Sequence, residues 1–275
     1  MRILVTGANG YLGQGIVKNI LDLGHDVIAT DLILDCVDSR AKMIPCDIFD
    51  KQNPYTFFEK PDVLLHLAWR DGFVHYSDNH VKDFSKNYMF LRDFACSNID
   101  KIAVMGSMHE IGFYEGCINA ETPCNPVTPY GICKNALREL LECLVKQNNK
   151  MYQWLRGYYI VGNSEFGSSI FSKITAAEKK GEEYFPFTMG KNQFDFMDYS
   201  DFCKSVARVV CQNEVLGIIN ICSGYPEKLS DRVERFIRDN EYSIKLRYGA
   251  FPDRPYDSKA VWGDGSLLEK VNSMY

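Results

Sequence analysis

Several features that mark particular protein classes are missing from this sequence. No apolar stretch approaches the roughly 20 residues that a membrane-spanning helix needs. Met1 leads directly into an apolar run, without the charged segment and apolar core of a secretion signal. The formal net charge of −5 gives no general attraction for nucleic acid. We therefore expect a cytoplasmic protein that binds neither nucleic acid nor membranes.

Close cysteine pairs are also missing, although the 275 residues include ten cysteines. The cysteines are scattered singly, so the spacings of a zinc site or a dithiol redox motif do not occur. We expect no metal site, and reduced cysteines that are mostly buried as small hydrophobic residues. Repeats and low-complexity tracts are absent as well. The length suits one large domain, or one domain with a smaller lobe.

The strongest local pattern lies in the first 31 residues. An apolar run over residues 2–6 predicts a buried strand, and apolar residues at helical spacing over 12–23 predict a helix. Between them lie three glycines, Gly7, Gly10 and Gly13. A turn without Cβ atoms lets the backbone approach a pyrophosphate, and the first amides of the helix face its oxygens. This combination predicts a dinucleotide-binding turn.

A second apolar run, residues 27–30, ends at Asp31. A carboxylate at this place can accept hydrogen bonds from both hydroxyls of an adenosine ribose, and it repels a 2′-phosphate. The sequence therefore favours NAD over NADP, although NADP stays possible.

Later apolar runs complete the expected architecture. Runs at 63–69 and 102–105 alternate with helical patterns at 85–96 and 129–144. This alternation predicts an α/β fold: a Rossmann-type, doubly wound parallel sheet with a smaller C-terminal substrate-binding lobe. We expect residues 1–157 to form the dinucleotide-binding domain, completed by about 193–222. Residues 158–192 and 223–275 would then form the lobe.

A candidate catalytic group lies at the best-marked helix start, where Thr128 can cap the helix and Pro129 suits its first turn. Tyr130 and Lys134 are four residues apart and so share one helix face. A phenol with a pKa near ~10 is a weak catalyst, but a neighbouring ammonium stabilises its phenolate. Ser107 ends an apolar strand and could bind the substrate oxygen whose proton Tyr130 gives or takes.

Taken together, these motifs resemble the extended short-chain dehydrogenase/reductases, the NAD-dependent epimerase/dehydratase family that acts on nucleotide sugars. Ser107 precedes Gly112 by five residues, as the catalytic Ser or Thr of the family precedes its glycine. The other matching pieces are residues 6–13, Asp31, 46–48, 66–68, Asn87, Tyr130 with Lys134, 194–201 and 220–224.

The resemblance implies roles for particular residues. Catalysis would use Ser107, Tyr130 and Lys134, and the substrate would be a nucleotide sugar. A homodimer, or an oligomer built from dimers, would form through the helix that carries Tyr130 and its neighbour. The cofactor would contact Gly7, Asn9, Gly10, Tyr11, Leu12, Gly13, Asp31, Asp47, Ile48, Leu67, Ala68, Trp69, Tyr130 and Lys134. The substrate would contact Ser107, Met108, His109, Tyr130 and Arg254.

Departures from the family pattern narrow the expected reaction. Met108 and His109 stand where 4,6-dehydratases carry an Asp-Glu pair, which disfavours dehydration. Tyr159 stands where epimerases and dehydratases usually carry an Asn, and the chain is closer in length to the reductases. We expect an NAD(P)H-dependent reductase of a nucleotide-linked 4-keto-6-deoxyhexose in surface-polysaccharide sugar biosynthesis. Two alternatives stay open: a nucleotide-sugar 4-epimerase with retained NAD, and a non-catalytic dinucleotide-sensing protein.

Overall fold

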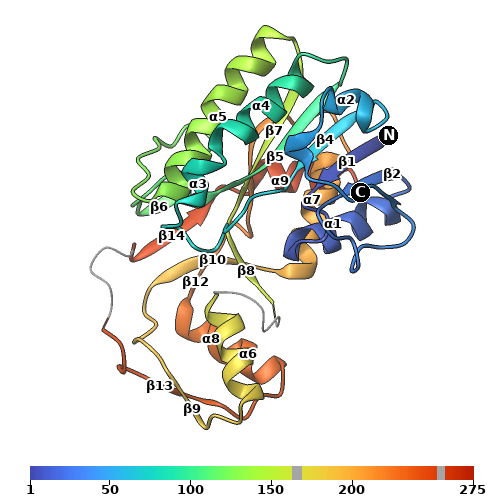
Figure 1. Cartoon of the computed structure of the whole chain (residues 1–275). Coiled ribbons are helices and arrows are strands. Elements are labelled where there is room, and N and C mark those ends of the chain that lie inside the picture. The colour runs from blue at the N-terminus through green and yellow to red at the C-terminus, as the bar shows by residue number, and fades with distance from the viewer. Residues whose placement is uncertain (163–168, 253–257) are drawn as a thin grey trace.

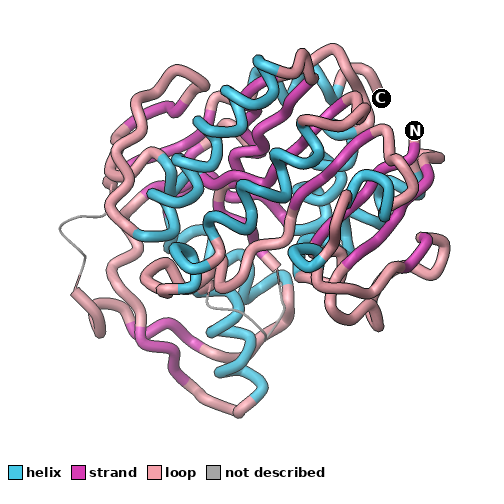
Figure 2. The backbone as a smooth tube through the Cα atoms, turned by 45° about the horizontal axis from the view of Figure 1, so that its top comes forward, coloured by secondary structure: helices cyan, strands magenta, loops and turns pink. Residues whose placement is uncertain are grey.

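The computed structural model describes residues 1–162, 169–252 and 258–275. A larger part is built on a central sheet between two layers of helices, and a smaller lobe lies below it in the view of Figure 1. Figure 2 shows the central strands enclosed by helices on both sides. The predicted α/β fold is confirmed.

The central sheet has seven strands, all parallel, in the order β11-β7-β5-β4-β1-β2-β3. The chain runs outward from β1 in one direction to β3, then crosses back to β4 and continues in the other direction. Such a reversal leaves a crevice at the carboxyl ends of β1 and β4, where open α/β sheets bind ligands. The strands are β1 (Arg2–Thr6), β2 (Asp26–Thr30), β3 (Lys42–Met43), β4 (Val63–His66), β5 (Lys101–Ser107), β7 (Met151–Gly157) and β11 (Gly217–Ile221).

Both faces of this sheet are covered, because successive side chains of a strand point to opposite sides. On one face Ile3 and Val5 pack with α1 (Tyr11–Asp22), α7 (Tyr199–Val210) and α9 (Ser266–Asn272). On the other face Leu4 packs with α2 (Pro54–Phe57), α4 (Phe84–Ala95) and α5 (Pro129–Gln147). The near-continuous apolar runs of the sequence therefore correspond to strands buried on both sides.

A second sheet has the order β12-β10-β14-β6, and β8 also pairs with β10. The buried Asp195 carboxylate on β10 accepts hydrogen bonds from the backbone N–H groups of Ser223, Gly224 and Gly263 and so ties three segments together. The strands are β6 (Gly116–Ile118), β8 (Tyr159–Val161), β10 (Gln193–Asp198), β12 (Pro226–Lys228) and β14 (Ala260–Gly263).

The small lobe has its own apolar cluster. It contains Phe171, Phe187 and Phe236. The elements there are α6 (Ile170–Lys179), α8 (Leu229–Asp239) and the parallel pair β9 (Tyr184–Pro186) and β13 (Lys245–Arg247). The remaining short helices are α3 (Asn79–Lys82) and the 3₁₀ turns η1 (Ile48–Asp50) and η2 (Met108–Glu110).

The predicted helices and strands agree with these bounds, except that one strand is shorter than its apolar run. The Thr128 hydroxyl caps α5 by accepting the Gly131 N–H at 3.1 Å. The apolar run at 63–69 forms a strand only as far as His66, because the chain there turns past the glycine loop.

All ten cysteines are unpaired, but Cys133, Cys203, Cys211 and Cys222 alone are buried, so the expectation of mostly buried thiols is wrong. Among the described residues, no helix combines the length and apolar character needed to span a membrane.

Candidate active site

The glycine turn after β1 has the geometry of a dinucleotide site. Gly7 has φ +68°, and a Cβ there would lie 2.8 Å from the backbone nitrogen of Ala68. A Cβ on Gly13 would lie 2.2 Å from the Gly7 carbonyl oxygen, so the turn can close onto α1 only with glycine. Gly10 is the N-cap of α1 and has no side chain to bind the first amides of the helix. Those amides are therefore available to a pyrophosphate.

Asp31 lies beside this turn, at the end of β2. Its carboxylate accepts the backbone N–H groups of Asn9 at 3.1 Å and Leu32 at 2.8 Å, which hold it toward the glycine loop. The Cys46 N–H donates to the Asp31 carbonyl at 2.9 Å and brings the segment with Asp47 and Ile48 alongside. These residues fit the adenosine half of NAD: a carboxylate for the ribose, and a chain segment next to it for the base.

A buried hydrogen-bond chain fixes the strand end that faces the glycine turn. His66 lies between the Thr6 hydroxyl and the Asn87 side-chain oxygen, at 2.9 Å from each. The Asn87 side-chain amide donates to the Asp83 carbonyl, and the Thr6 hydroxyl accepts the Ala68 backbone N–H at 3.3 Å. Burial lowers the pKa of His66 to about 4, so the ring is neutral and holds one proton, which it donates to Asn87. The chain positions Leu67 and Ala68 against Gly7.

Ser107, Tyr130 and Lys134 come together at the carboxyl end of β5. Ser107 is the last residue of β5, and Tyr130 and Lys134 lie in the first turns of α5. They are 8%, 9% and 3% exposed, and the Ser107 side chain acts to lower the pKa of the Tyr130 phenol. Lys134 Nζ donates to the Met105 carbonyl of β5 at 2.8 Å. The structure thus places a hydroxyl, a phenol and an amine side chain near the same strand end.

Burial has the largest effect on the pKa values of Tyr130 and Lys134. It raises the pKa of Tyr130 to about 12, opposed by the hydrogen bond from Ser107. It lowers the pKa of Lys134 to about 7, opposed by the negative charge of Glu110. The Lys134 ammonium also lies 3.9 Å from the centre of the Trp69 ring, a cation–π distance. Tyr130 is thus a protonated acid at neutral pH, as proton donation requires.

Rings surround Tyr130. His75 stacks on it with centroids 5.0 Å apart and planes 7° apart, and the His109 ring lies 4.2 Å from His75. Trp69 meets the phenol ring edge-on and donates its indole N–H to His80 at 3.0 Å. Sequence reasoning missed His75 and His80, because no spacing in the sequence links either histidine to Tyr130. His109 was expected in the site, and it lies near Tyr130, with ring centroids 6.2 Å apart.

Other expected residues have different surroundings. Met108 is buried and packs with Ile111 and Ile118. Tyr159 lies on β8 with its ring 4.8 Å from Phe194. Arg254 lies outside the described residues. Within the part of the chain that is described, no group of three or more His, Cys, Asp or Glu side chains could hold a metal ion.

The model of the NAD-dependent epimerase/dehydratase family matches residues 3–222. The chain belongs to this family. It is 41% identical over 271 residues to a protein of Aggregatibacter actinomycetemcomitans named dTDP-6-deoxy-L-talose 4-dehydrogenase (NAD(+)), covering 96% of this chain and 99% of that protein. The resemblance seen in the sequence is confirmed.

Solved structures share the fold at low sequence identity. A UDP-glucose 4-epimerase of Thermotoga maritima with UDP-glucose superposes with a TM-score of 0.82 at 19% identity, over 98% of this chain and 92% of that one. A UDP-glucuronic acid 4-epimerase of Bacillus cereus, in complex with UDP-glucuronic acid and NAD, superposes with a TM-score of 0.82 at 19% identity, over 100% of this chain and 94% of that one.

Membership in this family decides two of the expectations drawn from the sequence. The chain is an NAD-dependent enzyme, as predicted. The alternative of a non-catalytic dinucleotide sensor is set aside, because the chain belongs to a family of NAD-dependent enzymes.

Proposed function

We propose that the protein interconverts a keto group and a hydroxyl group at C4 of a nucleotide-linked 6-deoxyhexose, using NAD(H) as a consumed co-substrate. The observation that carries this proposal is the 41% identity to a dTDP-6-deoxy-L-talose 4-dehydrogenase over 99% of that protein's length. A dTDP-linked sugar is accordingly the first substrate to test. In the reductive direction the product would serve the synthesis of surface polysaccharide.

The chemistry divides between cofactor and protein. Reduced NAD supplies the hydride that C4 of the sugar receives. Tyr130 gives its phenolic proton to the carbonyl oxygen, so that a C–H and an O–H bond form as the C=O π bond is lost. Ser107 donates a hydrogen bond to the same oxygen. In the oxidative direction each group acts in reverse.

Lys134 makes proton transfer from Tyr130 possible. A phenol with a pKa of about 12 gives up its proton at a high energetic cost. An ammonium one helical turn from the phenol, as Lys134 is on α5, would lower that cost by Coulomb attraction. The Met105 carbonyl and the Trp69 ring hold the ammonium in place for this purpose.

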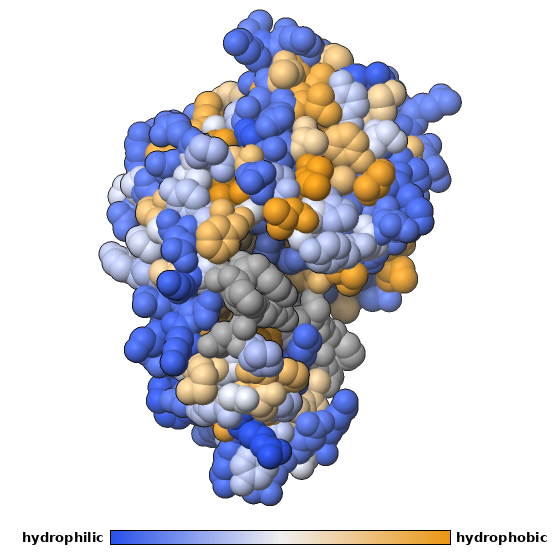
Figure 3. All heavy atoms as spheres, turned by 90° about the vertical axis from the view of Figure 1, so that its left-hand side faces the viewer, coloured by the Kyte–Doolittle hydropathy of each residue, from blue (hydrophilic) through white to orange (hydrophobic). Residues whose placement is uncertain are grey.

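Two further proposals concern assembly and location. Met89 on α4 and Ile132 and Leu140 on α5 are large apolar side chains that are 43%, 51% and 37% exposed. Figure 3 views the molecule from the side on which α5 lies and shows apolar side chains gathered over the larger part. These helices support a homodimer with a shared helical interface. We place the enzyme in the cytoplasm, where nucleotide sugars and NAD(H) are available.

The decisive experiment incubates the protein with a panel of nucleotide-linked 4-keto-6-deoxyhexoses and follows the absorbance of NADH. The proposal predicts one NADH consumed for each sugar reduced. A 4-epimerase would convert its substrate without net consumption, because it regenerates its cofactor in each cycle. Turnover of that kind would contradict the proposal.

A further inference from the structure

Glu110 is a buried carboxylate within the active site that the mechanism above does not use. It is the last residue of η2, the turn that directly follows Ser107, and none of its surface is exposed. Its Oε1 accepts the Ser107 backbone N–H at 2.6 Å, while the Ser107 hydroxyl accepts the His109 N–H at 3.3 Å. The two residues form a capping box. The carboxylate therefore holds the backbone of the residue whose hydroxyl meets the substrate.

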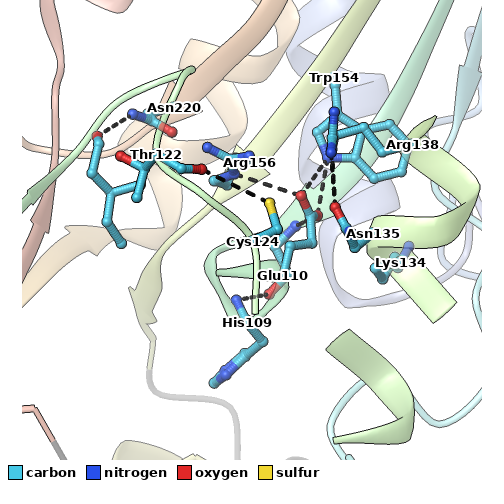
Figure 4. A network of polar contacts seen from close by, with 12 residues as sticks. His109, Glu110, Thr122, Cys124, Lys134, Asn135, Arg138, Trp154, Arg156 and Asn220 are labelled. Atoms are coloured by element: carbon cyan, nitrogen blue, oxygen red, sulfur yellow. Dashed lines mark hydrogen bonds and ion pairs between the residues drawn. The ribbon is translucent and has the colours of Figure 1, made fainter. Parts of the chain in front are cut away.

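The same carboxylate is tied to the neighbouring strand, as Figure 4 shows. The Trp154 indole N–H lies 2.9 Å from both Glu110 oxygens, and Arg156 Nε lies 3.5 Å from Oε2. Trp154 and Arg156 are on β7 and are fully buried. Arg156 also donates from Nη1 to the Asn119 carbonyl at 3.1 Å. Glu110 thus connects the catalytic turn to the interior of the sheet.

Packing around this contact leaves little freedom. A Cβ on Gly106, the residue before Ser107, would lie 2.1 Å from Trp154 Nε1 and 2.6 Å from Glu110 Oε1. The indole and the carboxylate therefore lie directly against the backbone that leads into Ser107. In the register of the sheet Gly106 pairs with Arg156. Strand pairing and the side-chain contacts therefore both hold the β5 backbone just before Ser107.

Stability alone does not account for a charged pair at this place. Desolvation of two buried charges offsets most of their attraction, so well-packed apolar residues would stabilise the fold about as well. What the hydrogen-bonded contacts add is direction, because the N–H groups of Ser107 and Trp154 have to point at the carboxylate. Burial raises the pKa of Glu110, and the nearby Arg156 charge and the N–H donors act in the opposite sense.

We propose that Glu110 is a positioning residue for the reaction: held by Trp154 and Arg156, it fixes the backbone of Ser107 and thereby aims the Ser107 hydroxyl at the substrate oxygen and Tyr130. This inference rests on the role given to Ser107 in the proposed function. It adds a residue that the catalytic Ser-Tyr-Lys set does not contain.

Glu110→Gln tests the proposal with almost no change in volume. The amide keeps one oxygen for the Ser107 N–H, but its NH₂ group faces the N–H donors of Trp154 and Arg156. We expect kcat per folded molecule to fall by roughly 10- to 100-fold, the loss that a misplaced catalytic group causes. The KM for the sugar and the dissociation constant of NADH should stay within about two-fold. Trp154→Phe removes a single donor, folds with its ring packing largely kept, and should show a smaller loss of kcat.

A matched control separates positioning from loss of stability. Lys101 lies at the other end of β5, where its ammonium binds the carbonyls of Val210 and Gln212 and the side chain of Asn213. Lys101→Met should lower the melting temperature without changing kcat per folded molecule. If Glu110→Gln behaves like Lys101→Met, with lower stability and unchanged kcat, the proposal is overturned.

A crystallographic comparison decides the question without reference to activity. In Glu110→Gln the proposal predicts a displaced Ser107 backbone and a Ser107 hydroxyl that points away from Tyr130. An unmoved Ser107 would overturn it. A wild-type protein that turns over none of the nucleotide-linked sugars would refute the proposed function instead, and the position of Ser107 in the two crystals would still decide the role of Glu110.

Discussion

Replacing Tyr130 by Phe removes one oxygen atom from the site and leaves the ring. The phenol is 9% exposed and packs against His75 at 5.0 Å, and Trp69 and His80 lie nearby. Because Phe preserves these ring contacts, the loss of stability should not exceed about 1 kcal/mol, the net value of one hydrogen bond. NADH affinity should also persist, since the glycine turn and Asp31 are untouched.

Activity should respond very differently. Without the phenol, the developing alkoxide has no proton donor, and the turnover number should fall by about 10²–10⁴. This fall corresponds to roughly 3–5 kcal/mol on the reaction barrier. The predicted cost to catalysis is thus several times the predicted cost to folding.

The assay compares wild type and Tyr130→Phe at equal folded concentration. NADH oxidation in the presence of a nucleotide-linked 4-keto-6-deoxyhexose gives kcat, NADH fluorescence gives the dissociation constant, and urea unfolding gives the stability. A variant that keeps more than about a tenth of the wild-type turnover would remove Tyr130 from proton transfer. A variant that loses NADH binding to the same extent would show that the hydroxyl acts in cofactor binding and not only in proton transfer.

Three other predictions test separate parts of the site. Asp31→Ala should narrow the preference for NADH over NADPH, as measured by the two dissociation constants; a wild type that binds NADPH better would contradict the role of Asp31. Lys134 has a folded-state pKa of about 7, below its unfolded value of 10.5. Because the unfolded chain binds the additional proton above pH 7, wild type should gain up to about 1.4 kcal/mol of stability per pH unit relative to Lys134→Met between pH 7 and 10. The prediction is refuted if urea unfolding gives the same difference in unfolding free energy between wild type and Lys134→Met at pH 7 and at pH 9. Arg254→Ala should raise the KM for the sugar nucleotide and leave NADH affinity nearly unchanged, with Arg254→Lys also weaker than wild type because it loses bidentate contact; equal losses for both ligands would contradict a role in substrate binding.

Much of the Rossmann part could be predicted from the sequence, because its signals are local. The glycines of the turn, the carboxylate of Asp31 and the Thr128 cap are each tied to a strand end or a helix start within a few residues. Apolar runs without alternation predicted strands buried on both faces. Those features lie in the half of the site that is proposed to bind the cofactor.

Residues that depend on long-range contacts could not be predicted in the same way. His75 reaches Tyr130 across 55 positions of the chain, and nothing in the loop around it indicates that contact. Glu110 carried a usable signal, since Ser107-Met-His-Glu110 has the S-x-x-E spacing of a capping box. Its partners Trp154 and Arg156 come from β7, however, and only the pairing of β5 with β7 brings them to the carboxylate.

The most direct test of the central claim uses NADH carrying deuterium at C4 of the nicotinamide ring, on the face that the enzyme transfers. After reaction with a nucleotide-linked 4-keto-6-deoxyhexose, NMR of the sugar locates the label. The account predicts one deuterium at C4 of the product for each NADH consumed. Product without deuterium, or deuterium at another carbon, would contradict it.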